Sequence, residues 1–255
     1  MGNLENKTVL VTGASRGIGR ATAFAMAAAG AKVLVHYGRS VQEADAVVAA
    51  IQSNGGKAEA LGGDLSAPEG AASLAEKVRA LVGNRLDAVV LNAGVSKAAP
   101  LAAYTPGDLD NLFATNVRGP FFLVQQLVPL LGEGSNIVVV TSAVARKVVG
   151  KPALENPSIL AYASTKGALE TLVKNWAAIL GPRGIRVNAV APGIIDTDMS
   201  SFTKTEAGRE VALNLQALKR IGKPEDVADV ITFLASDAAR WITGASIPAD
   251  GGSGL

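Results

Sequence analysis

Seven short apolar runs, rich in β-branched residues, recur along the chain. Each run is nearly unbroken instead of alternating with polar residues, which is typical of strands buried on both faces of a sheet. We therefore expect strands at Thr8–Thr12, Lys32–His36, Ala58–Leu61, Ala88–Leu91, Asn136–Thr141, Arg186–Val190 and Ala245–Pro248.

Stretches rich in Ala and Leu separate these runs and predict helices at Gly17–Ala29, Val41–Ser53, Pro68–Leu81, Pro106–Leu131, Ile159–Leu180 and Pro224–Leu234. The spacings Ser40 to Glu43 and Ser66 to Glu69 predict capping boxes at two helix starts. Two longer stretches, Arg146–Ser158 and Ile194–Ile221, break the alternation, and loops of this length are usually functional or mobile.

The alternation of strands and helices predicts the fold class. Short connections between them favour an α/β protein with a Rossmann-type doubly wound parallel sheet of about seven strands, in three α/β/α layers. We expect a single domain over residues 1–255. In such sheets ligands bind at the carboxyl ends of the strands, where the strand order reverses.

Composition narrows the function classes. The chain has 24 Lys and Arg against 22 Asp and Glu, a formal net charge of +2, no Cys and one His among 255 residues. The basic residues are scattered, so a nucleic-acid partner is not indicated. The absence of Cys and the single His36 exclude thiolate metal sites, Cys nucleophiles and the usual Ser-His-Asp triad. We expect His36 to be a packed histidine without a functional role.

The start of the chain and its apolar runs bear on location. No signal peptide is visible, and no apolar stretch reaches the ~20 residues that a membrane span needs. We therefore expect a cytoplasmic protein with no membrane partner.

A glycine-rich loop follows the first predicted strand directly. Its sequence is Thr12-Gly13-Ala14-Ser15-Arg16-Gly17-Ile18-Gly19. Glycines let the backbone turn tightly and approach a pyrophosphate, and the helix that follows offers free N–H groups at its positive end. A tight turn without a ligand is the alternative, but the position between a strand and a helix favours dinucleotide binding.

A tyrosine and a lysine lie four residues apart in the predicted helix Ile159–Leu180. Tyr162 and Lys166 would share one helix face. Reduction of a carbonyl leaves an alkoxide that needs a proton, and a phenol with a pKa near 10 gives one up reluctantly. In a site that excludes water, an ammonium about 4 Å away would lower the phenol pKa by roughly 3 units, to near 7. A pair of surface side chains is the alternative.

The end of the second predicted strand bears on cofactor choice. An NAD site needs a carboxylate there for the ribose 2′-OH, but the segment contains Tyr37, Arg39 and Ser40, with no acid before Glu43. Arg39 could form a forked contact with a 2′-phosphate, and Arg16 could approach from the other side. NADP(H) is the cofactor that this pattern favours; two solvated surface arginines are the alternative.

The glycine loop and the Tyr-x-x-x-Lys pair together resemble the short-chain dehydrogenase/reductase family, over essentially the whole chain from Lys7 to Gly252. The resemblance implies further cofactor contacts at Asp64, Leu65, Asn92, Ala93, Gly94, Pro192, Gly193, Ile195 and Thr197.

The resemblance also implies a catalytic tetrad of Asn116, Ser142, Tyr162 and Lys166. In that tetrad the serine hydroxyl holds the substrate oxygen, and the asparagine anchors a water in a proton relay. Ser142 and Tyr162 are 20 positions apart, more than is usual in the family, because of the extra segment Arg146–Ser158. Thr141 is therefore an alternative to Ser142.

The function implied is a metal-free, NADPH-dependent reduction of a ketone or 3-oxoacyl-type carbonyl, with Tyr162 as the general acid. Oxidation of a sugar or secondary alcohol at the same site is an alternative function. A more remote alternative is a non-catalytic protein that senses a dinucleotide. An enoyl-reductase-like site would place its lysine near Leu169 instead. We expect pocket walls from Val95–Leu101, Val144–Ile159 and Ile194–Leu215.

The family resemblance implies a homotetramer. The helices Pro106–Leu131 and Ile159–Leu180 would pair between subunits.

Overall fold

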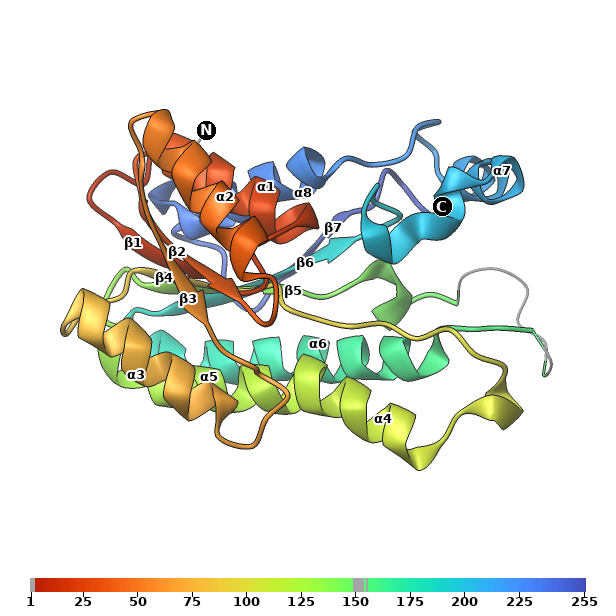
Figure 1. Cartoon of the computed structure of the whole chain (residues 1–255), viewed down its shortest axis with the longest axis horizontal. Helices are drawn as coiled ribbons and strands as arrows, with labels where there is room; N and C mark the ends of the chain where they lie inside the picture. The colour runs from red at the N-terminus through yellow and green to blue at the C-terminus, as the bar shows by residue number, and fades with distance from the viewer. Residues whose placement is uncertain (1–2, 149–153, 155) are drawn as a thin grey trace.

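The computed structural model describes residues 3–148, 154 and 156–255 of the chain. One parallel sheet of seven strands lies in the middle of the molecule, in the order β3-β2-β1-β4-β5-β6-β7 (Figure 1). The strand order reverses between β1 and β4, as in a doubly wound sheet. The strands are β1 Thr8–Val11, β2 Lys32–Tyr37, β3 Lys57–Gly62, β4 Ala88–Leu91, β5 Asn136–Val140, β6 Arg186–Pro192 and β7 Ser246–Ala249.

Helices cover both faces of this sheet, with α1, α2 and α8 on one side and α3, α4, α5 and α6 on the other (Figure 1). Their bounds are α1 Gly17–Ala28, α2 Val41–Ser53, α3 Gly70–Val82, α4 Pro106–Phe113, α5 Gly119–Leu127, α6 Leu160–Leu180, α7 Glu206–Leu215 and α8 Pro224–Ala235. The α/β class and the three layers predicted from the sequence are confirmed.

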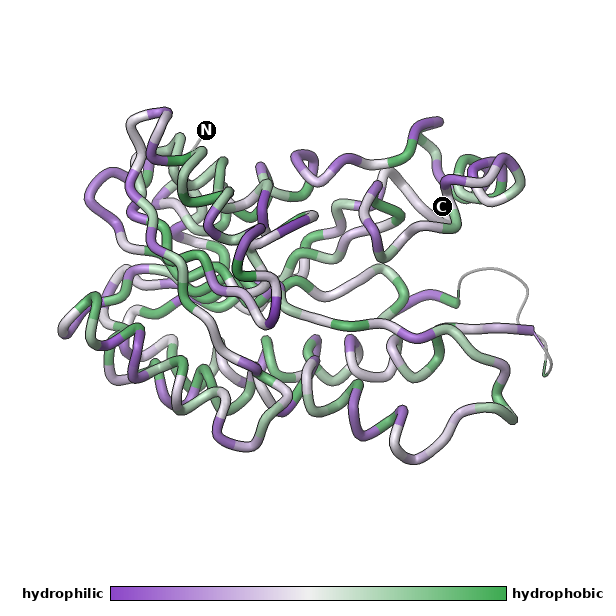
Figure 2. Tube along the Cα trace, in the orientation of Figure 1, coloured by the Kyte–Doolittle hydropathy of each residue, from purple (hydrophilic) through white to green (hydrophobic). Residues whose placement is uncertain are grey.

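Successive strand residues enter two separate cores, one on each face of the sheet. Leu10 packs with the α3–α6 side, whereas Val9 and Val11 pack with the α1–α8 side, and none of the three is exposed. Figure 2 shows hydrophobic residues gathered in the central strands. Burial on both faces explains why the apolar runs are unbroken.

Both predicted capping boxes are wrong. Ser40 is the N-cap residue of α2, but its side chain makes no capping hydrogen bond. Ser66 donates its hydroxyl to Asp64 and accepts no amide hydrogen bond among the described residues, and α3 begins at Gly70 instead of Pro68. In this second case the local turn around Asp64 replaces the predicted helix start.

The single helix predicted over Pro106–Leu131 is divided. A π-helical turn at Ala114–Arg118 separates α4 from α5, and a 3₁₀ turn follows at Val128–Leu130. Pro120 has no N–H to donate to the carbonyl of Asn116 four residues earlier, so an α-helical ladder cannot continue through this point. The turn places Asn116 in the interior.

The stretch Ile194–Ile221 contains helical structure and is not an open loop. It holds the 3₁₀ segment Asp198–Lys204 and the helix α7. Figure 1 shows α7 projecting beyond the end of the sheet, close to the C-terminus. This pair of helical segments hangs over the carboxyl ends of the strands.

Candidate active site

The glycine-rich loop forms a tight turn at the carboxyl end of β1. Gly13 and Gly17 have φ angles of +63° and +54°, a region that side chains other than glycine rarely adopt. A Cβ on Gly13 would lie 2.9 Å from the Cα of Ala93, and one on Gly19 would lie 2.3 Å from the carbonyl oxygen of Gly13. Glycine is therefore required at these positions for the backbone to fold this way.

The start of α1 presents unpaired amides. Arg16 is the N-cap residue, and no side chain caps this end. The first main-chain bond of the helix runs from the Arg20 N–H to the Arg16 carbonyl, 3.1 Å long, whereas the amides of Gly17, Ile18 and Gly19 donate to no group among the described residues. These three amides come shortly after Ser15 and lie at the positive end of the helix. They form an anion site suited to a diphosphate.

Thr12 and Asn92 tie this loop to the end of β4. The Thr12 hydroxyl accepts hydrogen bonds from the amides of Asn92 (2.9 Å) and Ala93 (3.0 Å). The Asn92 side-chain amide donates to the carbonyls of Thr12 (2.9 Å) and Gly13 (3.1 Å). The structure therefore brings Asn92 and Ala93 to the loop. It also brings Thr12, which is part of the glycine-rich motif but was not among the expected cofactor contacts.

The corner beyond β2 and β3 carries the groups expected near the adenosine end of a cofactor. Tyr37 ends β2 and Arg39 follows it. The Asp64 carboxylate accepts from the Ser66 amide (2.9 Å) and hydroxyl (2.6 Å), and these bonds, with the charge of Arg39, lower the Asp64 pKa. Leu65 is buried beside them. Asp64 and Arg39 are therefore close enough to interact.

Arg16 does not face that corner in the structure. Its guanidinium lies 3.4 Å from the Asp198 carboxylate, in an ion pair whose two side chains are about two-thirds exposed. Below this pair, a Cβ on Gly17 would lie 3.3 Å from the Thr197 methyl group. The segment after β6 therefore rests directly on the glycine-rich loop.

The segment Pro192–Thr197 leaves the end of β6 under close packing. A Cβ on Gly193 would lie 2.8 Å from the Cα of Asp250, so only glycine fits there. Ile195 is buried, and a parallel bridge joins it to Gly222. This packing fixes the backbone that carries Thr197 to the glycine-rich loop.

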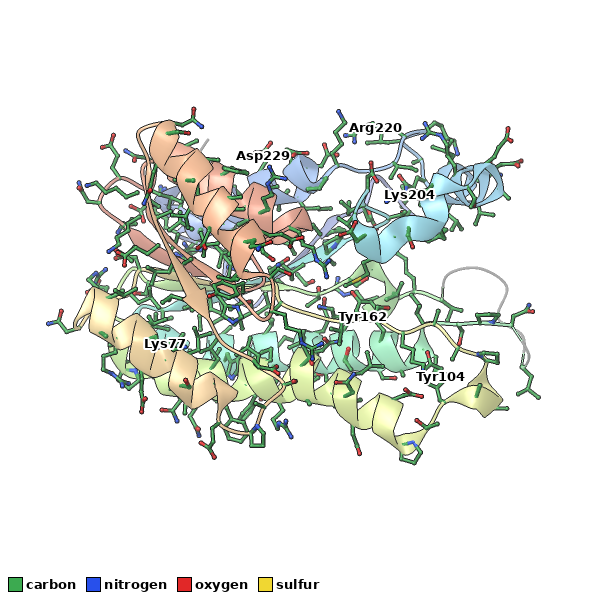
Figure 3. The ribbon with its side chains drawn as sticks, in the orientation of Figure 1. Lys77, Tyr104, Tyr162, Lys204, Arg220 and Asp229 are labelled. Carbon is green, nitrogen blue, oxygen red and sulfur yellow. The ribbon has the colours of Figure 1, made fainter. Side chains whose placement is uncertain are left out.

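Tyr162 and Lys166 meet on the inner face of α6, as their spacing predicts. In Figure 3 Tyr162 lies between α6 and the sheet. The Lys166 ammonium is 5.6 Å from the centre of the Tyr162 ring and donates a 2.7 Å bond to the Val140 carbonyl at the end of β5. The Ser142 hydroxyl, just beyond that strand, lies near enough to the Tyr162 hydroxyl to lower its pKa. A phenol, a hydroxyl and an ammonium thus gather at one strand end.

Thr141 points away from this group. Its hydroxyl lies 2.7 Å from a carboxylate oxygen of Glu170, which also accepts from Ser246 (2.8 Å). Arg146 forms an ion pair with the other oxygen of Glu170. The hydroxyl beside Tyr162 is therefore that of Ser142. Glu170, one helical turn beyond Lys166, anchors the chain around it, and no sequence pattern singles Glu170 out.

Asn116 is fully buried and links the tyrosine helix to the end of β4. Its side-chain oxygen accepts from the Val95 amide (2.9 Å), and its nitrogen donates to the Val95 carbonyl (2.9 Å) and the Thr165 hydroxyl (3.0 Å). A Cβ on Gly94 would lie 3.3 Å from the Asn116 oxygen and 3.7 Å from the Lys166 nitrogen. Both amide hydrogens of the Asn116 side chain are therefore committed to protein partners.

The expected phenol pKa near 7 is wrong for the chain by itself. Burial raises the pKa of Tyr162 to about 12, although the nearby Ser142 hydroxyl acts in the opposite direction. Burial also lowers the pKa of Lys166 to about 8, because the charged form loses its hydration. The spacing of the two residues along a helix predicts that they meet, but it does not predict how strongly burial desolvates each of them.

Two of the segments expected to form the pocket walls, Val95–Leu101 and Val144–Ile159, pair with each other in the structure. Ala99 and Ser158 form an antiparallel bridge, and the Tyr104 hydroxyl lies 2.8 Å from the Ser158 carbonyl. Lys147 is held by Asp250 and by the Ser253 carbonyl. Residues 149–153 and 155 of the predicted insertion lie outside the described residues. Exposed apolar side chains on the three walls are Val95, Leu101, Val148, Leu154, Met199, Phe202 and Val211.

The described part of the chain contains neither a metal-binding cluster nor a membrane-spanning helix. No cluster of His, Asp and Glu there could hold a metal ion. No helix there is long and apolar enough to cross a membrane.

Comparison with known proteins gives a consistent result. Residues 13–254 match a family model described as Enoyl-(Acyl carrier protein) reductase, which covers short-chain dehydrogenases/reductases. The chain is 41% identical to versicolorin reductase 1 of Aspergillus parasiticus, over 98% of this chain and 97% of that one. It is 35% identical to tetrahydroxynaphthalene reductase of Pyricularia oryzae, over 98% and 90% of the two chains.

Solved structures agree with these sequence relatives. The angucycline C-6 ketoreductase LanV with bound NADP superposes with a TM-score of 0.91 and 38% identity, over 100% of this chain and 98% of that one. The reductase LugOII, which catalyses keto-reduction at C1 during lugdunomycin biosynthesis, gives a TM-score of 0.91 and 40% identity, over 99% and 100% of the two chains.

Proposed function

The chain belongs to the short-chain dehydrogenase/reductase family of NAD(P)-dependent oxidoreductases, and from this premise we propose that it is an NADPH-dependent ketoreductase for polycyclic aromatic ketones. One observation carries the proposal. The Tyr162 phenol, the Ser142 hydroxyl and the Lys166 ammonium gather at the end of β5, joined through Gly94 and Ala93 to the glycine-rich loop.

The residues at the strand ends suit a dinucleotide. The backbone around Gly13 and Gly19 has no room for a side chain, and the first amides of α1 are available to a diphosphate. Arg39 follows the end of β2, where no acidic side chain stands to select a 2′-OH, and this supports Arg39 as the cation for a 2′-phosphate. Lys166 has ammonium N–H groups beyond the one given to Val140 and could hold the nicotinamide ribose. We therefore propose NADP(H) as the cofactor.

The chemistry divides between the cofactor and three side chains. Bound NADPH supplies the hydride to the carbonyl carbon. The Ser142 hydroxyl orients the carbonyl oxygen, and the Tyr162 hydroxyl gives that oxygen its proton. With a pKa of about 12, Tyr162 is protonated at neutral pH, which is the form that a general acid needs. With a pKa of about 8, Lys166 is mostly an ammonium there and stabilises the phenolate left behind.

Apolar side chains on the segments expected to form the pocket walls support an aromatic ketone over a sugar as the substrate. Met199 and Phe202 of the overhanging segment are about half exposed, as are Val211 and Leu101. Sugars require a lining of polar groups, whereas a flat aromatic ketone would bury this apolar surface. The relatives named for reduction of versicolorin, tetrahydroxynaphthalene and angucyclines suggest the same class. An enoyl-reductase arrangement is disfavoured because Leu169 is buried in the core.

A substrate panel tests this proposal. We expect oxidation of NADPH, followed by its absorbance, with hydroxylated polycyclic aromatic ketones, and slower oxidation with 3-oxoacyl thioesters and keto sugars. Faster turnover of a keto sugar or of a 3-oxoacyl thioester would contradict the substrate class. Absence of NADPH oxidation with every carbonyl tested would contradict the reductase itself.

We also propose that the chain forms a homotetramer. The outer face of α4, α5 and α6 carries a groove of about 680 Å³ whose lining includes Phe121, Phe122 and Leu172. Phe121 and Phe122 are 40% and 44% exposed, which is unusual for large aromatic side chains on a monomer. Light scattering should give the mass of four chains for the wild type and a smaller mass for Phe122→Lys; a wild-type monomer would contradict the proposal.

A further inference from the structure

His36 stands where the glycine-rich loop, β2 and the end of β3 meet. It is the only histidine of the chain and is 2% exposed. A Cβ on Gly63 would lie 3.5 Å from its Nε2 atom, so the glycine leaves room for the ring. Buried polar groups are costly without partners, so the two ring nitrogens of His36 need hydrogen-bond partners in this position.

Both ring nitrogens have partners of fixed character. The Gly13 N–H donates to His36 Nδ1 at 3.2 Å, and His36 Nε2 lies 2.9 Å from the Gly63 carbonyl oxygen. An amide N–H can only donate and a carbonyl can only accept, so the neutral ring must carry its proton on Nε2. The network therefore fixes the tautomer.

The same residue holds the loop a second time. The backbone carbonyl of His36 accepts from the Ala14 N–H at 2.8 Å. Two consecutive amides of the loop are thus turned toward β2. The next amides, at the start of α1, are left to face a diphosphate.

On the opposite side Ala93 contacts Gly13, and Asn92 binds the Gly13 carbonyl. On the β2 side the His36 ring holds the same glycine by accepting from the Gly13 N–H. Without the ring the partly buried Gly13 N–H would lose its acceptor, and only the backbone bond from Ala14 would hold the loop on the β2 side.

We propose that His36 is a positioning residue of the cofactor site, whose neutral ring bridges Gly13 to Gly63 and so holds the glycine-rich loop in the form that accepts a dinucleotide. The inference rests on the proposed function and adds a residue that touches no part of the cofactor itself. Because the loop binds the diphosphate common to both nicotinamide cofactors, replacing His36 should weaken the binding of NADPH and NADH equally. Replacing Arg39, by contrast, should weaken only the binding of NADPH, through its 2′-phosphate.

Burial and charge agree with a neutral ring. Burial lowers the pKa of His36 to about 4; the bond to Gly63 raises it, the nearby Lys77 on α3 lowers it, and Asp64 after β3 raises it. The ring should therefore keep its acceptor at Nδ1 throughout the neutral range.

Nuclear magnetic resonance of the ligand-free protein, with ¹⁵N in the histidine ring, tests the bridge directly, since all histidine signal comes from one residue. We expect an unprotonated Nδ1, a protonated Nε2 and no titration between pH 8 and about pH 5. A proton on Nδ1, or titration near pH 6.5, would overturn the proposal.

Binding of NADPH and NADH, followed by their fluorescence, tests the consequence. His36→Asn places an acceptor near Nδ1 and should keep both affinities within about threefold, whereas His36→Gln and His36→Leu should weaken both by about tenfold or more. If His36→Leu does not fold, the Asn and Gln variants carry the comparison. Equal affinities for wild type, Asn and Gln variants would overturn the inference while leaving the proposed function intact. Failure of the wild type to bind either nucleotide would overturn both.

Discussion

Replacing Lys166 with methionine should stabilise the ligand-free chain while removing its activity. The lysine nitrogen is buried, it bonds only to the Val140 carbonyl among the described residues, and no acidic group pairs with it there. Methionine has a similar length and carries no charge, so it fills the same space without a desolvation cost.

The size of the effect follows from the lysine pKa. The folded chain holds Lys166 with a pKa of about 8, against 10.5 for the exposed side chain. Each pKa unit of difference is worth about 1.4 kcal/mol, so at pH 7 the buried ammonium costs about 3 kcal/mol of stability. Between these two pKa values the unfolded chain binds more protons than the folded chain, so stability rises with pH through this window. At pH 10 the cost is about 1 kcal/mol.

Urea unfolding of wild type and Lys166→Met at pH 7 and pH 10 measures this difference. Between these pH values the unfolding free energy of the wild type should rise by about 2 kcal/mol relative to the variant, because the effects of all other titrating groups nearly cancel. The loss of the bond to Val140 changes the difference in unfolding free energy by nearly the same amount at both pH values. A stability difference that does not change with pH would refute the claim that the ammonium is desolvated in the ligand-free chain.

Three further predictions concern the cofactor edge. Arg39→Ala should weaken NADPH by about 10- to 100-fold and NADH hardly at all in fluorescence titrations, because only NADPH carries the 2′-phosphate; equal loss for both would contradict the assigned contact. Gly19→Ala should abolish binding of either cofactor by calorimetry, because its Cβ would lie 2.3 Å from the Gly13 carbonyl oxygen, and unchanged binding would show that the loop adapts. As pH falls from 6.5 to about 4, wild type should lose up to about 3 kcal/mol of stability relative to His36→Asn, since only the unfolded chain accepts the histidine proton; parallel pH profiles would contradict this.

Sequence patterns predicted those features of the site that depend on spacing along the chain. The unbroken apolar runs placed the strands, and the glycine order placed the loop at the end of β1. The four-residue spacing placed Tyr162 and Lys166 on one face of α6, where the structure has them. These are local properties of a strand, a turn and a helix, so a single sequence carries them.

Features that depend on a partner far away in the chain could not be predicted in this way. His36 was expected to be a packed side chain without a role, because nothing near it in the sequence shows that Gly13 and Gly63 will reach its two nitrogens. For the same reason the sequence does not predict that Thr141 bonds to Glu170. The Tyr162 pKa was misjudged since burial of the phenol is set by the whole fold.

Helix boundaries failed for a more local reason. Ser66 has the spacing of a capping residue, yet its hydroxyl bonds to Asp64 two residues earlier. A motif states which bonds a side chain can form, and neighbouring groups decide which one it does form.

We propose that Tyr162 donates the proton when a carbonyl is reduced, and the Tyr162→Phe variant tests this role. The variant removes one hydroxyl group and leaves the amides of α1 and the Arg39 corner unchanged. The measurement is single-turnover oxidation of prebound NADPH by a polycyclic aromatic ketone, with NADPH affinity determined on the same sample. We expect near wild-type NADPH affinity and a rate reduced by a factor of about 100 or more. Ketone reduction at the wild-type rate would contradict it.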